Sequence, residues 1–585
     1  MVDNKKVSLG FSVGHDKGAV LIIDGEIVVG ISEERLSRIK HDKSYDLNIP
    51  LKSINYCLDY ANLNYSDVDL YAYNTAELDE AAEQQIEFQF GLHLGQPSEK
   101  LKFMPHHLAH AYSAFFSSGY DEAAVIVSDA MGNVLNPNNS AYEWFIKDHP
   151  DKPNDPIEFG REWAEGHSIY HFDLKGWKEV DKKWVKHPFG WLDPNECLTI
   201  GTMYGTGTHQ LIYKYREDDP LNHWPAAGAG KLMGLASYAD KDWLANQPFI
   251  ADVKEDLDFF IPGTRVYPEI TVDSNFFAKA NVAGIYQREQ ERLSMVLVEK
   301  AKKLTGSKNI CVTGGSFLNC NSNELIVKSG LFEGCYFTPP ADDSGIPLGC
   351  AWWAYQQLEE ITENKFLSPY LGKPYTNLEA RQALQKMCQE NTDFLQGITF
   401  YEMKDDAEMA TAIVNLLFEN KAVGVCRGGS EIGPRALGNR SILANPTKGW
   451  MREYINLNVK GREWYRPFAP SVLDEWVGEI FDLDVFSPYM LVTTTVKEEW
   501  RDKIPAVVHV DNTSRIQSVR EDLNPFYHDL ISKFLELTGV PVVMNTSFNG
   551  PDEPVVETPY DAIRTFWKRN LDAVCVNNIL IVRNN

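Results

Sequence analysis

The sequence predicts an α/β protein of two domains. At 585 residues, the chain is longer than a single hydrophobic core usually supports. Strand-like apolar runs at Lys6–Phe11 and Ala19–Ile31 flank a polar turn, and Asp24-Gly25 marks a hairpin inside the second run. Further along, an amphipathic helix over Gln287–Leu304 leads into a short buried strand over Asn309–Thr313. Strands that alternate with helices are typical of sheets covered by helices.

The first polar turn, from Val13 to Gly18, contains His15 and Asp16. A strand, a polar turn and a second strand at this point fit an actin-like ATPase core, in which the turn faces the nucleotide phosphates. We therefore expect an actin-like domain over residues 1–366. His15 is the candidate general base, because the ordinary pKa of histidine lies nearest to neutral pH, and Asp16 could orient it. A buried structural histidine is the alternative.

The second domain is predicted to follow a linker. Residues 367–377 are rich in proline, glycine and polar side chains, which is typical of a connecting segment. Residues 378–585 then begin a new α/β pattern, with a helix over Asp405–Asn420 and a strand over Ala422–Cys426.

Two histidines, His106 and His110, follow Pro105, a residue that favours the first turn of a helix. Four residues apart on a helix, they share one face and could grip one metal ion. An apolar strand over Ala123–Val127 ends close to Asp129, whose carboxylate is well placed to complete such a site. Ordinary core or capping histidines are the alternative.

Composition narrows the choice of partners. The net charge of -26 and the pI near 5.0 argue against a nucleic-acid partner, since phosphate backbones require a basic face. Because no apolar run reaches about eighteen residues, we expect no membrane span. The nine cysteines are scattered without a C-x-x-C pair, which indicates reduced thiols in a cytoplasmic protein. A homodimer is one assembly that the sequence allows.

Against this acidic background, the stretch from Gly424 to Leu473 is strongly cationic. Glycines divide it into tight turns, where backbone N–H groups can approach an anion and arginine forks can match phosphate oxygens. We interpret it as a polyanion site for a nucleotide and a phosphorylated co-substrate. A solvated basic surface is the alternative. Its cationic residues are Arg427, Arg435, Arg440, Arg452, Lys460, Arg462 and Arg466.

The same stretch reads GPRALGNRSILANP, followed by K-G-R-E-x-x-R-P-F-A-P, and it resembles the signature of the NodU/CmcH carbamoyltransferase family. This family carbamoylates hydroxyl groups of sugars, macrocycles, cephems and alkaloid-like toxins. The resemblance runs from His15 to Asn549 and is weakest over 65–100 and 140–225. Four further motifs are similar to those of the family. They are the E-E-R-x-x-R-x-K pattern at Glu33–Lys40, GKLMGLA at Gly230–Ala236, HVDNTSRIQ at His509–Gln517 and NTSFN at Asn545–Asn549.

The resemblance implies a division of labour between the domains. The C-terminal, YrdC-like domain would convert ATP and carbamoyl phosphate into carbamoyl adenylate, and the actin-like domain would transfer the carbamoyl group to a hydroxyl. The residues it implies for the C-terminal site are Arg427, Ser430, Arg435, Arg440, Ser441, Lys460, Arg466, Arg515, Gln517, Asn545, Thr546, Ser547 and Asn549. For the N-terminal nucleotide site they are Lys231, Gly234, Gly314, Gly315 and Asn319.

The resemblance also implies a metal site and a functional lysine. Asp343, before Ser-Gly, matches the fourth metal ligand beside His106, His110 and Asp129, although its neighbour Asp342 stays open. Nitrogen and oxygen ligands suit iron, manganese or magnesium better than a structural zinc site. Lys40 is assigned to catalysis, whereas Glu33 and Glu34 could equally belong to a charged, salt-bridged helix.

The acceptor is named by no motif. The segment 140–225 is acidic and rich in tryptophan, which predicts a lid over the acceptor site. Aromatic faces and carboxylates would suit a small polar or cationic acceptor that carries an alcohol group. A peripheral subdomain is the alternative. The tryptophans are Trp144, Trp163, Trp177, Trp184, Trp191 and Trp224, and the acidic residues include Asp151, Glu158, Glu162, Glu165, Asp193 and Glu196.

Three rival functions make different demands on the sequence. A fused tRNA threonylcarbamoylation-type enzyme needs a basic stripe, and the pI argues against one. A hydrogenase-maturation carbamoyltransferase would carry C-x-x-C zinc modules, which this sequence lacks. A non-catalytic ATP-binding regulator of actin-like fold would not need the NTSFN and HVDNTSR motifs together with the arginine-rich stretch.

Overall fold

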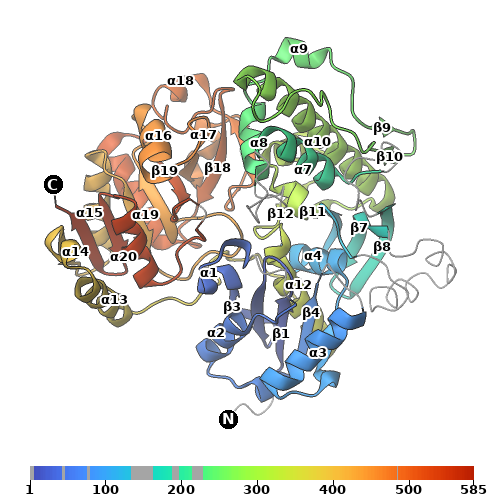
Figure 1. Cartoon of the computed structure of the whole chain (residues 1–585), viewed down its shortest axis with the longest axis horizontal. Helices are drawn as coiled ribbons and strands as arrows, with labels where there is room; N and C mark the ends of the chain where they lie inside the picture. Colours follow the sequence, from blue (N-terminus) through green and yellow to red (C-terminus); the bar gives the residue numbers. More distant parts are fainter. Residues whose placement is uncertain are drawn as a thin grey trace. The chain divides into compact units, whose positions relative to one another are not determined.

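The structure is a computed structural model of the chain and describes residues 5–42, 47–75, 80–133, 163–186, 197–213, 228–483, 485–551 and 553–584 (Figure 1). It forms two compact units. The first unit comprises Met1–Glu33 and Asp42–Leu367, and the second comprises Glu34–His41 and Ser368–Asn585. The second unit therefore contains a short N-terminal segment that the predicted domain boundaries assign to the first domain.

One five-stranded sheet of the first unit has the order β3-β2-β1-β4-β5. Strands β1 to β3 form an antiparallel meander, and β4 and β5 join it in parallel. The hairpin predicted at Asp24-Gly25 is present, and both residues have positive φ, as a tight hairpin turn requires. The strands are β1 (Val7–Ser12), β2 (Gly18–Ile23), β3 (Glu26–Ser32), β4 (Leu70–Asn74) and β5 (Leu101–Phe103).

A second five-stranded sheet repeats this order as β12-β11-β6-β7-β8. Again three strands form an antiparallel meander, and its first strand, β6, pairs in parallel with β11, followed by β12. Two sheets of the same order are the hallmark of the actin-like fold, so the predicted fold class is confirmed. The strands are β6 (Glu122–Ser128), β7 (Trp163–Asp173), β8 (Gly176–Lys186), β11 (Asn309–Thr313) and β12 (Gly334–Phe337).

Helix α4 (His106–Phe115) packs closely on helix α12 (Ile346–Leu358) because small residues meet at the contact. A Cβ placed on Gly349 would lie 1.8 Å from the carbonyl oxygen of Ala109, so only glycine fits. Similarly, a Cβ on Gly10 of β1 would lie 2.1 Å from the carbonyl oxygen of Pro347. These backbone contacts fix the start of α12 against α4 and against β1 of the first sheet.

The remaining elements of the first unit cover the sheets. Helix α10 is longer than the predicted 287–304, because it begins at Phe276, where the side chain of Asn275 caps it. The elements are α1 (Glu33–Ser37, shared with the second unit), α2 (Leu51–Ala61), α3 (Glu80–Leu94), α7 (Ile200–Leu211), α8 (Ala229–Ala236), α9 (Lys241–Ala245), β9 (Asp252–Val253), β10 (Phe259–Phe260), α10 (Phe276–Thr305) and α11 (Cys320–Lys328).

The second unit is built on a nine-stranded mixed sheet of order β13-β21-β20-β14-β15-β19-β16-β18-β17. Its strands are β13 (Ile398–Glu402), β14 (Val423–Cys426), β15 (Arg440–Ala444), β16 (Ala469–Leu473), β17 (Val492–Thr495), β18 (Thr513–Val519), β19 (Val542–Ser547), β20 (Ala573–Val576) and β21 (Ile579–Arg583). Its helices are α13 (Asn377–Glu390), α14 (Thr392–Gln396), α15 (Asp406–Phe418), α16 (Trp450–Tyr454), α17 (Val477–Ile480), α18 (Glu498–Arg501), α19 (Pro525–Thr538) and α20 (Pro559–Lys568).

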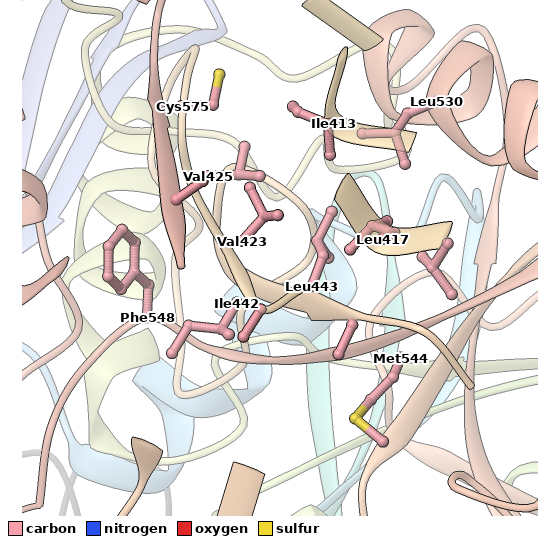
Figure 2. Close-up of a cluster of buried hydrophobic side chains, with 14 of the residues drawn as sticks. Ile413, Leu417, Val423, Val425, Ile442, Leu443, Leu530, Met544, Phe548 and Cys575 are labelled. Carbon is pink, nitrogen blue, oxygen red and sulfur yellow. The ribbon is translucent and has the colours of Figure 1, made fainter. Parts of the chain in front are cut away.

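The core of this unit lies between the sheet and its helices (Figure 2). Val423 and Val425 of β14 and Leu443 of β15 are buried with Leu417 of α15 and Leu530 of α19. The central strands are apolar at successive positions, which is expected of strands covered on both faces. No described helix of either unit is long and apolar enough to cross a membrane.

Leu530→Ala should destabilise the second unit by about 2–5 kcal/mol, because the side chain is fully buried and its removal leaves a cavity. Urea unfolding of the full chain checks this value. Leu537→Ala on the same helix is the matched control, since Leu537 is 45% exposed and should change stability by less than about 0.5 kcal/mol. Equal effects of the two variants would contradict the assigned core.

Candidate metal centre and anion site

Four side chains of the first unit come together from three different places in the fold. His106 and His110 share one face of α4, Asp129 follows β6, and Asp343 begins the short turn before α12. Their ligand atoms all lie within 4.8 Å of one another. The neighbouring Asp342 instead accepts a hydrogen bond from the Ser344 backbone, so it acts as a helix cap.

The distances between these groups are short. His110 Nε2 lies 3.1 Å from Asp129 Oδ2 and 3.4 Å from Asp343 Oδ1. His106 Nε2 lies 3.5 Å and 3.6 Å from the same two oxygens. Because both imidazoles and both carboxylates face one point, they could hold a cation.

The imidazoles and carboxylates of this cluster shift one another's pKa values. Burial alone lowers the pKa of His110, but hydrogen bonds with Asp129 and Asp343 raise it to about 9. Burial alone raises the pKa of Asp129, but the neighbouring imidazoles of His106 and His110 hold it well below its usual value. A divalent metal that binds ionised carboxylates and neutral imidazoles therefore displaces protons.

One atom of the cluster is suited to bind a metal. His106 Nε2 is buried and has no hydrogen-bond partner among the described residues. Buried polar atoms of this kind are uncommon and need an explanation such as an ion. The donor set of two imidazole nitrogens and two carboxylates suits iron, manganese or magnesium, and it lacks the thiolates typical of structural zinc.

Glycines predicted for nucleotide binding lie against this cluster. Gly314 has φ of +91°, and a Cβ there would lie 2.3 Å from the carbonyl oxygen of Ser128. A Cβ on Gly315 would lie 3.1 Å from Asp129 Oδ1. Gly201, at the start of α7, approaches the same turn, since its Cβ would lie 2.6 Å from Ala130. The sequence carries no local signal for Gly201, because its partner is remote in the chain.

His15 and Asp16 lie beside the cluster. His15 Nδ1 is 3.2 Å from Asp16 Oδ2, and His15 Nε2 is 3.4 Å from Asp343 Oδ2. Burial lowers the pKa of His15, but Asp343 and Asp16 outweigh it and raise the pKa to about 9. The role of His15 as a base stays a prediction.

The N-terminal segment that carries Lys40 belongs to the second unit. Arg38 donates to the carbonyl oxygens of Val555 at 2.7 Å and Pro554 at 2.9 Å. Lys40 is close enough to Lys460 to help lower its pKa. Lys40 is thus placed in a different unit from His15 and Asp16, although sequence reasoning grouped the three.

The acidic residues of this segment have ordinary structural partners. Glu33 accepts hydrogen bonds from the backbone and the hydroxyl of Ser53, at 2.8 Å and 2.6 Å. Glu34 accepts one from the backbone of His41. These contacts favour the structural alternative for both glutamates.

Cationic side chains gather around Lys460 in the second unit. The Lys460 ammonium donates to the carbonyl oxygen of Ser547 at 2.8 Å and to Asn549 Oδ1 at 2.6 Å. Burial, followed by the charges of Arg462 and Arg466, holds the pKa of Lys460 well below its usual value. Burial, followed by Arg466 and Arg515, does the same for Arg462.

Like charges that depress one another's pKa values are stabilised by a bound anion. The structure therefore brings together Lys460, Arg466, Arg515, Ser547 and Asn549 of the predicted anion site. It adds Arg462, which the sequence placed in the cationic stretch but not among the site residues.

Known proteins resemble this chain over most of its length. Residues 7–91 and 91–352 match the family description "Carbamoyltransferase N-terminus", and residues 414–583 match "Carbamoyltransferase C-terminus". The chain belongs to the carbamoyltransferase family. An uncharacterised protein of Synechocystis sp. is 30% identical, over 97% of this chain and 95% of its own length. Nodulation protein NolNO of Sinorhizobium fredii is 29% identical, over 97% and 79%. Nodulation protein U of Rhizobium tropici is 27% identical, over 98% and 96%.

Several predicted anion ligands of this carbamoyltransferase instead shape the loop around them. Arg440 is fully buried and donates to the carbonyl oxygens of Arg427, Gly428 and Asn439. Ser441 Oγ accepts a hydrogen bond from the backbone of Gly438. Because these groups face their own chain, we assign Arg440 and Ser441 to positioning the loop.

The amides predicted to orient a carbamoyl group are also tied to the loop. Gln517 Nε2 donates to Leu437 at 2.8 Å, and Asn545 Nδ2 donates to Ala436 at 3.2 Å. Asn545 Oδ1 is buried and has no hydrogen-bond partner among the described residues, so it could accept from a ligand N–H group. Thr546 is half-buried beside it on β19.

The other predicted residues of the second unit occupy the rim of the loop. Arg427 contacts Asp406 at 2.6 Å, and its guanidinium lies 4.0 Å from the centre of the Phe526 ring. Ser430 is buried against Gly372, and Arg435 is half-buried. Arg427 and Ser430 thus have structural partners, and Arg435 keeps its predicted role as a proposal.

In the first unit, Asn319 is also a structural residue. It caps α11 and exchanges two hydrogen bonds of 3.0 Å with Gln287. Lys231 lies on α8 with its ammonium 5.9 Å from the centre of the Tyr213 ring, and the buried Gly234 follows on the same helix.

The tryptophan-rich segment is described only in part. Trp163, Trp177 and Trp184 lie on the β7–β8 hairpin and are half-buried. Glu165 was predicted to face a cationic acceptor, but it is buried and pairs with Lys182 at 2.9 Å, so this assignment is wrong. Outside the described residues lie Trp144, Trp191, Trp224, Asp151, Glu158, Glu162, Asp193 and Glu196.

Lys182→Ala should destabilise the first unit by about 3–5 kcal/mol, because it leaves the buried Glu165 carboxylate unpaired. Unfolding by urea at pH 7 measures this loss. Lys183→Ala is the matched control, since its pair with Asp258 is partly exposed and contributes at most about 1 kcal/mol. Equal losses would contradict the buried pair.

The same pair predicts a pH dependence. Although burial raises the pKa of Glu165, the charge of Lys182 lowers it to about 2, below the ordinary glutamate value. The folded pKa is depressed, so this stabilisation is present above the unfolded pKa and is lost as the pH falls toward 2.

Proposed function

We propose that this chain is an ATP-dependent O-carbamoyltransferase with two separate reaction sites. In the second unit, carbamoyl phosphate and ATP would give carbamoyl adenylate, with one water consumed and phosphate and pyrophosphate released. In the first unit, the carbamoyl group would pass to an alcohol. Family membership supports carbamoyl transfer to oxygen. The presence of a cationic cluster in the second unit and a metal-ligating cluster in the first supports two separate reaction sites.

The observation that carries the adenylate step is the cationic cluster around Lys460. Several phosphate groups must be held together in this reaction, and their charge must be stabilised as the carbamate oxygen attacks the α-phosphorus. The charges of Arg462 and Arg466 help to lower the pKa of Lys460, and bound anions would relieve this repulsion. Asn545 Oδ1 is suited to accept from the carbamoyl NH2 group.

The transfer step is supported by the cluster in the first unit. His106, His110, Asp129 and Asp343 would hold one divalent metal, which would supply Lewis-acid stabilisation of negative charge. The acceptor hydroxyl attacks the carbamoyl carbon, AMP leaves, and the hydroxyl proton passes to a base. His15 is the candidate, because it is next to Asp343 and is held by Asp16. A metal bound by Asp343 would offset the carboxylate charge that raises the pKa of His15, and so would favour the neutral base.

The acceptor is proposed to be a small molecule with an alcohol group. The half-buried tryptophans of the β7–β8 hairpin supply aromatic faces, which suit a polar ring or a cation. Because Glu165 is paired with Lys182, it provides no charge for a cationic acceptor. The aromatic faces therefore carry this assignment.

Arg435→Ala and Arg466→Ala should each abolish pyrophosphate release that depends on carbamoyl phosphate, because a lost phosphate contact removes transition-state stabilisation. Pyrophosphate release from ATP is measured with and without carbamoyl phosphate. Arg520→Ala is the control, since Arg520 is an exposed arginine paired with Asp522. Normal release from the folded site variants would refute the adenylate site, and no release from the wild type would favour a non-catalytic ATP-binding protein.

His110→Ala should lose bound metal and carbamoyl transfer but keep pyrophosphate release, because His110 belongs to the first unit only. Metal analysis and the pyrophosphate assay are run on the same preparation. His171→Ala is the control, since this half-buried histidine pairs with Glu122 outside the cluster. Unchanged metal content in His110→Ala would place the site elsewhere.

A further inference from the structure

Two buried asparagines surround His106 and were not indicated by the sequence. Asn74 ends β4, and Asn133 follows Asp129 in the next turn; each side chain is 1% exposed. His106 Nδ1 lies 3.0 Å from Asn74 Oδ1. The backbone N–H of His106 donates to Asn133 Oδ1 at 2.7 Å. Both ends of the His106 residue are therefore held by side chains from other elements.

The orientation of both amides follows from their partners. Asn74 Nδ2 lies 2.7 Å from the Met104 carbonyl oxygen and 3.2 Å from Asn133 Oδ1. Asn133 Nδ2 lies 2.7 Å from the Thr75 carbonyl oxygen. Only an NH2 group can donate to these oxygens, so the oxygen of Asn74 must be the atom that faces His106.

The tautomer of His106 follows in turn. Because Asn74 Oδ1 is an acceptor only, His106 Nδ1 must carry the proton. In the neutral ring this leaves a lone pair on Nε2, the same buried atom that lacks a partner among the described residues and faces Asp129 and Asp343. The ring is thus prepared to bind a metal through one defined nitrogen.

We propose that Asn74, supported by Asn133, is a positioning residue that locks His106 as the Nδ1–H tautomer and selects Nε2 as a metal ligand. This inference rests on the proposed metal centre. A hydrogen bond to the second ring nitrogen fixes the orientation of a metal-bound histidine and raises its basicity. An asparagine does this without adding a third negative charge beside Asp129 and Asp343.

The other histidines of α4 show why this contact is selective. His110 Nδ1 is 3.5 Å from Thr313 Oγ1, a much longer contact. His107 Nδ1 is 2.9 Å from Ser168 Oγ, and that ring faces the β7 strand rather than the cluster. His106 is therefore the histidine of the cluster whose ring orientation is most tightly determined.

The support reaches the β7–β8 hairpin through Asn133. Its backbone N–H donates to Glu165 Oε2 at 3.0 Å, and its carbonyl oxygen accepts from the Glu165 N–H at 3.2 Å. Glu165 is in turn held by Lys182. The buried Glu165–Lys182 pair thus fixes the turn that carries Asn133. Glu165 therefore supports the position of His106 indirectly, through Asn133.

The test uses Zn²⁺ as a diamagnetic probe on the full chain. Asn74→Ala should weaken Zn²⁺ binding about 10–100-fold, the range found when an outer partner of a metal ligand is removed. Competition with a chromogenic chelator measures the affinity. Asn323→Ala is the matched control, because Asn323 is equally buried but donates to the Phe317 carbonyl oxygen outside this network. Its Zn²⁺ affinity should match that of the wild type.

A spectroscopic readout separates positioning from stability. In Zn²⁺-loaded protein labelled with ¹⁵N-histidine, the wild type should show a slowly exchanging Nδ1–H proton that His106→Gln removes. Asn74→Ala should lose this signal or exchange it rapidly. Asn133→Ala, which keeps Asn74 but removes its support, should show a smaller loss of affinity and faster exchange, and it decides the matter if Asn74→Ala does not fold.

Three outcomes distinguish the possible failures. Unchanged Zn²⁺ affinity and an unchanged Nδ1–H signal in the asparagine variants would overturn the positioning role. An equal loss of affinity in Asn323→Ala would overturn it as well, since the effect would then be one of general stability. Full Zn²⁺ binding by His110→Ala would instead overturn the metal centre on which the inference rests.

Discussion

The first unit depends on one constraint, the direct backbone contact between α4 and α12. Gly349 allows the carbonyl oxygen of Ala109 to approach α12 at a distance that excludes any side chain. That approach brings the histidine face of α4 to Asp343 at the start of α12, while the actin-like sheet order brings Asp129 to the same point. Without it, the four side chains from distant parts of the chain would not lie within 4.8 Å of one another.

The second unit gathers several positive charges within an acidic protein. Its sheet carries Ser547 at the end of β19, and the Lys460 ammonium is buried against it. Arg440 and Glu431 do not face a ligand; they organise the loop, since Glu431 Oε1 accepts backbone hydrogen bonds from Leu437 and Asn439. The buried charges of Arg440 and Glu431 therefore fix the shape of the loop, whereas the cluster around Lys460 consists of other cationic side chains.

Sequence reasoning recovered what local patterns encode. The hairpin at Asp24-Gly25, the shared helix face of His106 and His110 and the buried strand before Gly314 each follow from spacing or turn chemistry. The repeated sheet order could not be predicted from the sequence. The two sheets share the order in which their strands pair, but their strands do not share a recognisable residue pattern. Likewise, Asn74, Asn133 and Gly201 contact partners that are far away in the chain. The burial of Glu165 depends on its pairing with Lys182 of β8, which only the structure shows.

The central claim is that two imidazoles and two carboxylates of the first unit bind a divalent metal. X-ray absorption spectroscopy of the protein loaded with one equivalent of Fe²⁺ and dialysed tests this most directly. The account predicts a shell of nitrogen and oxygen only, with the outer-shell scattering of two imidazole rings and no sulfur. Loss of the iron on dialysis, or a sulfur shell, would contradict it.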